Sequence, residues 1–219
     1  VLWRDVEART YVVLLTASVV GVALFLAWHG VYAGFAESLR HAAFNVVSIA
    51  TTTGYATVDY AQWPIFAPVF MLFLCSFATC AGSTGGGIKL VRSLLLLKQA
   101  RLELVRVIHP RAVVPLRLGS TTVSSQVMSS VIAFMLLYGS VMVVATLALL
   151  LSGLDLVTAS TAAIACINNT GPGLGQVGPA GNFQGLSDFQ TWVCTISMLL
   201  GRLELVAVMV VFTASFWRR

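Results

Sequence analysis

The chain has 219 residues, of which 58% are hydrophobic and only 10% are charged, and its formal net charge is +5. This composition lies far from that of soluble globular domains and predicts an integral membrane protein. The positive charge does not indicate nucleic acid as a partner, because the basic residues are not interleaved with aromatic residues on a polar surface. No catalytic pair or triad is present in the sequence, so we do not expect an enzyme.

The first half opens with a polar segment and then runs without a charge over residues 11–28. A helix of that length covers about 27 Å, close to the ~30 Å hydrocarbon core of a bilayer, and is predicted to cross it. A helix start at Glu37 and Ser38 then leads into a second apolar segment, residues 39–50. That segment is too short to cross, so we expect it to enter the membrane and return to the same side.

A polar tract, Thr52-Thr53-Gly54, follows this short segment. A cation that has lost its water needs a ring of oxygen ligands, which backbone carbonyls and threonine hydroxyls supply. Glycine permits the backbone angles that turn successive carbonyls toward one axis. The negative end of the preceding helix also favours a cation. The tract therefore predicts a pore loop that conducts cations.

Residues 64–88 form another uncharged run, which Pro64 opens in the manner of a first helical turn. The run contains a glycine tract that no continuous helix should hold, because each glycine costs about 1 kcal/mol against alanine. We interpret it as an intramembrane gate, with a helix kink or a close-packing surface as the alternatives. It is not a nucleotide-binding loop, because Ile88 separates the last glycine from Lys89. The tract comprises Gly82, Ser83, Thr84, Gly85, Gly86 and Gly87.

Residues 89–117 carry seven basic side chains, and Pro110 and Pro115 end any helix there. This segment is a signal for the cytoplasmic side, and docking of a cytoplasmic regulatory protein is the second interpretation. All four cysteines lie in apolar surroundings without metal-ligand spacing, which predicts small core side chains. They are Cys75, Cys80, Cys166 and Cys194.

The second half repeats the order of the first. An uncharged run over residues 118–154 predicts a crossing that starts near Val123, and Asp155 is a predicted N-cap. A half-length apolar helix over residues 156–167 then leads to a second polar tract, Asn169-Thr170-Gly171. A shift of 117 residues aligns this tract with Thr52, Thr53 and Gly54.

The last crossing spans residues 189–216 and is interrupted by Arg202 and Glu204. A charge near the middle of a membrane helix needs a partner. Glu204 points elsewhere on a helix, so we expect Arg202 to contact carbonyls of the glycine tract; the alternative is that it reaches the inner surface.

Four crossings and two re-entrant loops place every basic cluster on one side, which is then cytoplasmic. The predicted fold class is an all-α integral membrane protein with two repeats of transmembrane helix, re-entrant pore helix and loop, and transmembrane helix. Two pore loops do not enclose a fourfold axis. Either two copies assemble, or the N-terminal portion of a longer protein carries two more repeats, which we favour.

The motifs FNVVSIATTTGYATVDYAQWP, GSTGGGIK, INNTGPGLG and LLGRLEL resemble the membrane subunit of the bacterial Trk potassium uptake system, in the Trk/Ktr/HKT superfamily. This resemblance implies that residues 1–98 are the third pore repeat with a broken second helix, residues 99–118 a cytoplasmic basic linker, and residues 119–219 the fourth repeat. It implies a potassium filter and a gating loop, with Arg202 beside that loop. The filter would comprise Thr52, Thr53, Gly54, Asn169, Thr170 and Gly171, of which Thr52, Thr53, Asn169 and Thr170 would be potassium ligands.

The resemblance further implies potassium as the transported ion, no organic cofactor, and a location in the bacterial inner membrane with several crossings. The implied partners are the N-terminal half of the same protein, a second copy in a homodimer, a cytoplasmic nucleotide-binding regulatory ring and the lipid bilayer. Proton-coupled symport and gated passive flow both remain open. The alternatives to potassium uptake are a non-conducting membrane scaffold and a less selective potassium and sodium channel subunit.

Overall fold

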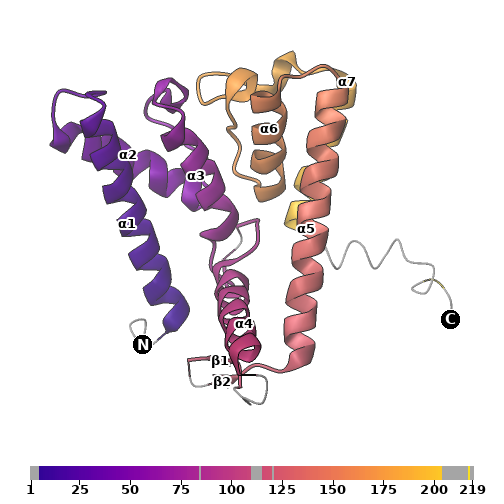
Figure 1. Ribbon diagram of the computed structural model, residues 1–219. Coiled ribbons are helices and arrows are strands. Elements are labelled where there is room, and N and C mark those ends of the chain that lie inside the picture. Colours follow the sequence, from indigo (N-terminus) through magenta and orange to yellow (C-terminus); the bar gives the residue numbers. More distant parts are fainter. Residues whose placement is uncertain (1–4, 84, 110–114, 120, 204–216, 218–219) are drawn as a thin grey trace.

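The computed structural model describes residues 5–83, 85–109, 115–119, 121–203 and 217. The regular elements among these residues are helices apart from one small hairpin, and the helices form two groups with a long helix below them (Figure 1). The elements of the first group are α1 (Val6–Trp28), α2 (Phe35–Ala50), the 3₁₀ turn η2 (Tyr60–Gln62) and α3 (Phe66–Phe77). Then come α4 (Leu90–Ile108), β1 (Arg117–Leu118) and β2 (Thr121–Thr122). The second group is α5 (Ser125–Leu151), α6 (Leu156–Asn168), the turns η3 (Gly175–Val177) and η4 (Phe183–Gly185), and α7 (Asp188–Arg202).

Helices α1 and α5 are the two described helices that are long and apolar enough to cross a membrane, with 23 and 27 residues. Helix α1 begins earlier than the charge-free run predicts, because the Asp5 carboxylate accepts a hydrogen bond from the Glu7 backbone N–H (3.0 Å) and caps the helix. The predicted start of α5 near Val123 agrees with its N-cap at Ser124.

The two half-length helices are confirmed, with 16 residues in α2 and 13 in α6. Helix α2 begins at Phe35, before the predicted start at Glu37. The predicted N-cap of α6 is confirmed, since the Asp155 carboxylate accepts a hydrogen bond from the Thr158 N–H (3.0 Å). Both helices lie at the end of the molecule opposite the hairpin, where each stops partway along its longer neighbour (Figure 1).

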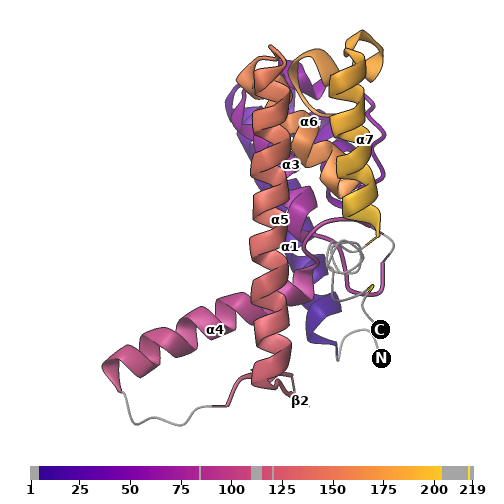
Figure 2. The same ribbon diagram turned by 90° about the vertical axis from the view of Figure 1, so that its right-hand side faces the viewer.

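The predicted break in the second apolar run of the first half is also confirmed. Helix α3 ends at Phe77 and the next helix starts at Leu90, with non-helical chain between them. Pro64 does not open α3, which begins at Phe66 after an N-cap at Ile65. Helix α4 then leaves the bundle to one side (Figure 2), and the proposed boundary between residues 98 and 99 falls inside it.

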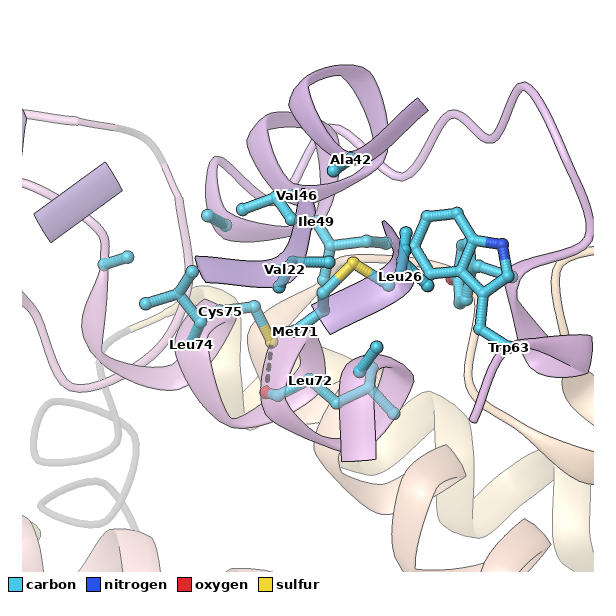
Figure 3. Packing of buried hydrophobic residues seen from close by; sticks show 14 of the residues in the cluster. Val22, Leu26, Ala42, Val46, Ile49, Trp63, Met71, Leu72, Leu74 and Cys75 are labelled. Carbon is cyan, nitrogen blue, oxygen red and sulfur yellow. Dashed lines mark hydrogen bonds between the residues drawn. The ribbon is translucent and has the colours of Figure 1, made fainter. Parts of the chain in front are cut away.

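A core cluster fixes the position of α2 between α1 and α3 (Figure 3). Val46 and Ile49 of α2 are fully buried against Leu26 of α1 and Met71 of α3. In lipid, such packing stabilises through close contact rather than through removal of apolar surface from water. Close packing of these buried side chains therefore holds the end of α2 in place, and with it the first polar tract.

The second group packs through smaller residues. Ala159, Ala162 and Ala163 of α6 are buried against Leu149 of α5 and against α7. Small side chains let membrane helices approach closely. At Gly201 of α7 an added Cβ would overlap the carbonyl oxygen of Ile167 at the end of α6. The second polar tract is therefore held by direct backbone packing.

Candidate functional site

The two polar tracts have the same backbone conformation. Thr52 and Asn169 both adopt left-handed angles, with φ of 56° and 54°, although neither is a glycine. The Thr53 N–H donates to the Ser48 carbonyl (2.8 Å), and the Thr170 N–H donates to the Ala165 carbonyl (2.9 Å). The residues of the second bond lie 117 positions after those of the first, the offset that the sequence alignment predicts.

A second pair of bonds follows the same offset. The Thr52 N–H donates to the Ile49 carbonyl and the Asn169 N–H to the Cys166 carbonyl, both at 3.0 Å. Together with the bonds from Thr53 and Thr170 these form the Schellman motif, in which the first residue after the helix is left-handed. Each half-length helix thus ends in the same way, and the polar tract begins at the same point of each ending.

The glycines of the tracts need their conformational freedom. Gly54 has φ of 81° and Gly171 has φ of 111°, angles that disfavour any residue with a Cβ. An added Cβ on Gly54 would also overlap the carbonyl oxygen of Thr170. The two tracts, far apart in sequence, therefore lie against each other.

Side chains fasten the tracts to their surroundings. The hydroxyls of Thr51 and Thr53 hydrogen-bond to each other (2.8 Å), and the Asn169 side-chain amide donates to the Met198 carbonyl of α7 (3.1 Å). The chain that leaves the first tract is held at Thr57, whose hydroxyl accepts from Asn45 Nδ2 (3.1 Å).

The chain that leaves the second tract returns along α6, the helix that precedes the tract. The Leu174 N–H donates to the Thr161 hydroxyl (2.9 Å), and the Gln176 N–H donates to the Thr158 hydroxyl (3.2 Å). Both hydroxyls belong to α6, so this helix holds the loop that follows it.

A cavity of about 500 Å³ lies against both tracts. Its lining combines residues that the sequence analysis assigned separately to the filter and to the gate. A side chain at Gly85 would lie 3.0 Å from the Thr52 hydroxyl, so the glycine tract approaches the first polar tract directly. The shared lining includes Thr52, Thr53, Asn169, Ser83, Gly85 and Arg202.

The chain that leaves the glycine tract is hydrogen-bonded to the last turn of α3 and to Thr79, which follows that helix. The Ile88 N–H donates to the Ser76 carbonyl (2.8 Å), and the Leu90 N–H donates to the Thr79 carbonyl (2.7 Å). The Thr79 hydroxyl donates to the Gly86 carbonyl (2.9 Å), and the Lys89 ammonium donates to the Ser83 carbonyl (2.7 Å). These four hydrogen bonds hold the tract beside the end of α3 and connect Ser83 to Lys89 across it.

Asn168, at the end of α6, is the residue around which these parts meet, and it was not among the predicted site residues. Its amide donates to the Ser76 hydroxyl (3.0 Å), and its side-chain oxygen accepts from the Tyr138 hydroxyl (3.1 Å). An added Cβ at Gly87 would lie 2.6 Å from that oxygen, and one at Gly86 would lie 2.5 Å from the Asn168 carbonyl oxygen. The sequence signal for this residue was an asparagine at the end of an apolar helix, and the structure buries it fully.

Arg202 lines the cavity beneath the tracts and also a smaller one of about 270 Å³. The smaller cavity is bordered by Gly85, Gly86 and Gly87, and by Lys89 and Arg92. The guanidinium of Arg92 lies over the Phe134 ring, 4.0 Å from its centroid. The predicted neighbourhood of Arg202 and the glycine tract is therefore present, with further positive charge around it.

The remaining predicted site residues that the structure describes do not line the cavity that the two tracts share. Thr170 and Gly171 line a third cavity between α6 and α7, while Gly82 is exposed with open space around it. Thr84 and the later part of the predicted last crossing lie outside the described residues.

Acidic residues stand at the outer ends of the elements around the tracts. The Asp59 carboxylate accepts from the Ala61 N–H (3.2 Å), and Asp188 lies in the first turn of α7. Hydrogen bonds from the side chain and the backbone of Thr158 hold the pKa of Asp155 below its ordinary value. Acidic side chains gathered at one end of the molecule attract cations to that end.

Comparison with known proteins adds to this geometry. The family model described as "TrkH: Cation transport protein" matches residues 1–219. The chain is 41% identical over 218 residues to the Trk system potassium uptake protein TrkH of Escherichia coli strain K12, covering 100% of itself and 45% of that protein. It is 40% identical over 216 residues to the Trk system potassium uptake protein TrkG of the same strain, covering 98% of itself and 44% of that protein.

A solved structure gives the same result. The crystal structure of the potassium transporter TrkH from Vibrio parahaemolyticus matches with a TM-score of 0.92 and 40% sequence identity, over 99% of this chain and 46% of that chain. The chain thus spans about half the length of the relatives that it matches. Since the family model covers it from end to end and the folds agree, the chain is an all-helical membrane protein that belongs to the TrkH family of cation transport proteins, and it is not an enzyme.

Proposed function

We propose that this chain contributes two of the four loops of a potassium filter in a longer protein that takes up potassium across the bacterial inner membrane. The observation that carries the proposal is the matched left-handed geometry of Thr52 and Asn169, each at the end of a half-length helix and both facing one cavity. Backbone oxygens and threonine hydroxyls at such positions suit a dehydrated cation. The names of the relatives, which are potassium uptake proteins, make potassium the proposed ion.

The glycine tract and Arg202 are proposed as the gate beneath this filter. The tract approaches Thr52 at Gly85 and shares a cavity with Arg202. A guanidinium beside a chain of backbone carbonyls adds positive charge in the path of a cation and contributes donors that hold a loop closed. The cavity lined by residues of both supports a path that runs from the filter to the gate.

The proposed assembly has three further parts. An N-terminal half of the same polypeptide supplies the other two loops, since two loops cannot surround an ion. A second copy completes a homodimer. A cytoplasmic nucleotide-binding ring docks on the inner surface, where α4 and its basic residues lie.

The experiment is expression of the full-length protein in a bacterial strain that lacks its own potassium uptake. We expect growth at low potassium and uptake of radioactive rubidium. Failure of both in cells that hold the protein in the membrane would contradict the proposal and favour the membrane scaffold.

The gate is tested separately in proteoliposomes. Arg202→Ala should raise rubidium flux in the absence of any regulatory protein, whereas Arg202→Lys, which keeps the charge, should raise it less. Flux and regulation equal to those of the wild type in Arg202→Ala would remove Arg202 from the gate.

A further inference from the structure

Two cysteines meet between the second pore helix and the helix that follows it. Cys166 of α6 and Cys194 of α7 are 3% and 4% exposed, and both are free thiols. They belong to the same packed cluster and line the same cavity. Two thiols on neighbouring helices that border one cavity can serve as a ligand pair, which an isolated core cysteine cannot.

The pair borders a cavity that a small solute can enter. The cavity holds about 380 Å³, and its lining includes Cys166, Cys194 and the tract residues Asn169, Thr170 and Gly171. The rest of the lining is largely apolar, with the hydroxyls of Thr191 and Thr195 as exceptions. The thiols are therefore buried within the fold but stand at the wall of a space beside the second polar tract.

We propose that Cys166 and Cys194 form a binding site for a soft divalent cation that takes two ligands in a line, of which the mercuric ion is the type. Each thiol releases one proton and each sulfur forms one bond to the metal, so one Hg²⁺ and two thiols give a neutral bis-thiolate and two protons.

Both the ligand number and the charge favour this class of ion. Hard cations such as potassium and magnesium prefer oxygen ligands, and zinc needs four ligands. Among the described residues no group of three or more His, Cys, Asp or Glu side chains could hold a metal. A neutral product also avoids the cost of an unpaired charge in an apolar cavity.

A metal bound between Cys166 and Cys194 would affect the second polar tract. Cys166 lies three residues before Asn169, and the Asn169 side chain already donates to the Met198 carbonyl of α7. A metal between Cys166 and Cys194 adds a bond between the same two helices, on the same cavity. We therefore expect the metal to reduce ion flux, a consequence that rests on the proposed function, whereas the binding itself does not.

The test uses purified full-length protein with one equivalent of mercuric chloride, followed by a wash with an excess of a monothiol such as glutathione. A two-thiol site keeps its metal through this wash, while single cysteines lose theirs. Bound mercury is measured by mass spectrometry, and free thiols are counted with a maleimide after unfolding.

Wild-type protein should keep one mercury, and Cys194→Ser or Cys166→Ser should lose it, with an affinity loss beyond the roughly 10-fold to 100-fold that changing an outer-shell partner costs. Cys75→Ser is the matched control, because Cys75 is equally buried but its thiol donates to the Leu72 carbonyl (2.9 Å). If Cys166→Ser fails to fold, Cys194→Ser alone decides.

Retention of mercury by Cys194→Ser at the wild-type level, or its complete loss from the wild type in the wash, would overturn the site. Rubidium uptake by cells, measured with and without the metal, tests the consequence. Inhibition of the wild type and not of Cys194→Ser supports it. Binding without inhibition would leave the metal site in place and overturn its link to the polar tract.

Discussion

Gly54 lies so close to Thr170 that a Cβ on the glycine would overlap the threonine carbonyl oxygen. These residues belong to different polar tracts, and each tract follows its own half-length helix. In the alignment of the two tracts, Gly54 corresponds to Gly171, the residue after Thr170. The contact makes the two tracts one structural unit. A change at either residue therefore acts on both.

Gly54→Ala should abolish most transport. The substitution forces a Cβ onto a residue with φ of 81° and pushes it into the carbonyl of Thr170. Backbone strain of this kind costs about 1–3 kcal/mol before the overlap is counted. We expect rubidium uptake to fall at least about tenfold, the factor to which 1.4 kcal/mol corresponds.

Gly30→Ala is the matched control, because Gly30 has a similar φ of 63° but open space around the added Cβ. It should fold and transport within about twofold of the wild type, because its backbone strain is of the same kind but the added Cβ meets no neighbouring atom. Equal uptake by the two variants would show that the contact with Thr170 is irrelevant to flux, as a scaffold would require.

Asn168→Ala should destabilise the protein by removing the link between three helices. The change leaves the hydroxyls of Ser76 and Tyr138 without this partner, and a buried polar group left unpaired costs about 1–3 kcal/mol. Thermal unfolding in detergent should show a clear loss for Asn168→Ala and a smaller one for Tyr138→Phe, which removes a single hydrogen bond. The double variant should lose less than the sum of the two. Strict additivity would contradict a shared network.

Features of the site that depend on a short stretch of sequence could be predicted. A half-length apolar segment followed by a polar tract with glycine predicts a short helix that ends in a loop, and α2 and α6 are short helices of this kind. The broken helix before Leu90 followed from glycine's poor helix propensity.

The contacts that join these parts were not predictable in the same way. The bond between Asn168 and Ser76 spans 92 residues, and nothing in periodicity reports a contact at that distance. The left-handed backbone angle of Thr52 could not be predicted either, because threonine does not favour it. The angle follows from the Schellman ending of α2. The early start of α1 needed the Asp5 cap, which overrides the charges of its first turn.

Asp155 should support α6 through its charge. Because the pKa of Asp155 is lowered in the folded protein, its contribution is present above the ordinary value of 3.8 and is lost as the pH falls through the lowered pKa. Asp155→Ala should cost about 1 kcal/mol at neutral pH, whereas Asp155→Asn keeps an acceptor for the Thr158 N–H and should cost less.

Unfolding temperatures between pH 3 and pH 6 provide the measurement for Asp155. The advantage of the wild type over Asp155→Ala should shrink on acidification below about pH 4. An advantage that stays constant over this range would mean that the carboxylate charge contributes nothing to the cap.

Thr79→Val should loosen the glycine tract. Valine keeps the shape of the side chain but removes the hydroxyl that donates to the buried carbonyl of Gly86. Leaving that carbonyl without the bond costs the closed loop about 1–3 kcal/mol, and each 1.4 kcal/mol shifts the balance between closed and open loops tenfold. Rubidium efflux from proteoliposomes without a regulatory protein should therefore rise, because the open loop becomes more populated. Thr79→Ser keeps the donor and should remain close to the wild type. If Thr79→Val stays as closed as the wild type, the hydrogen bond to Gly86 does not hold the gate, and the backbone hydrogen bonds from Ile88 to Ser76 and from Leu90 to Thr79 would be sufficient to keep the loop in place.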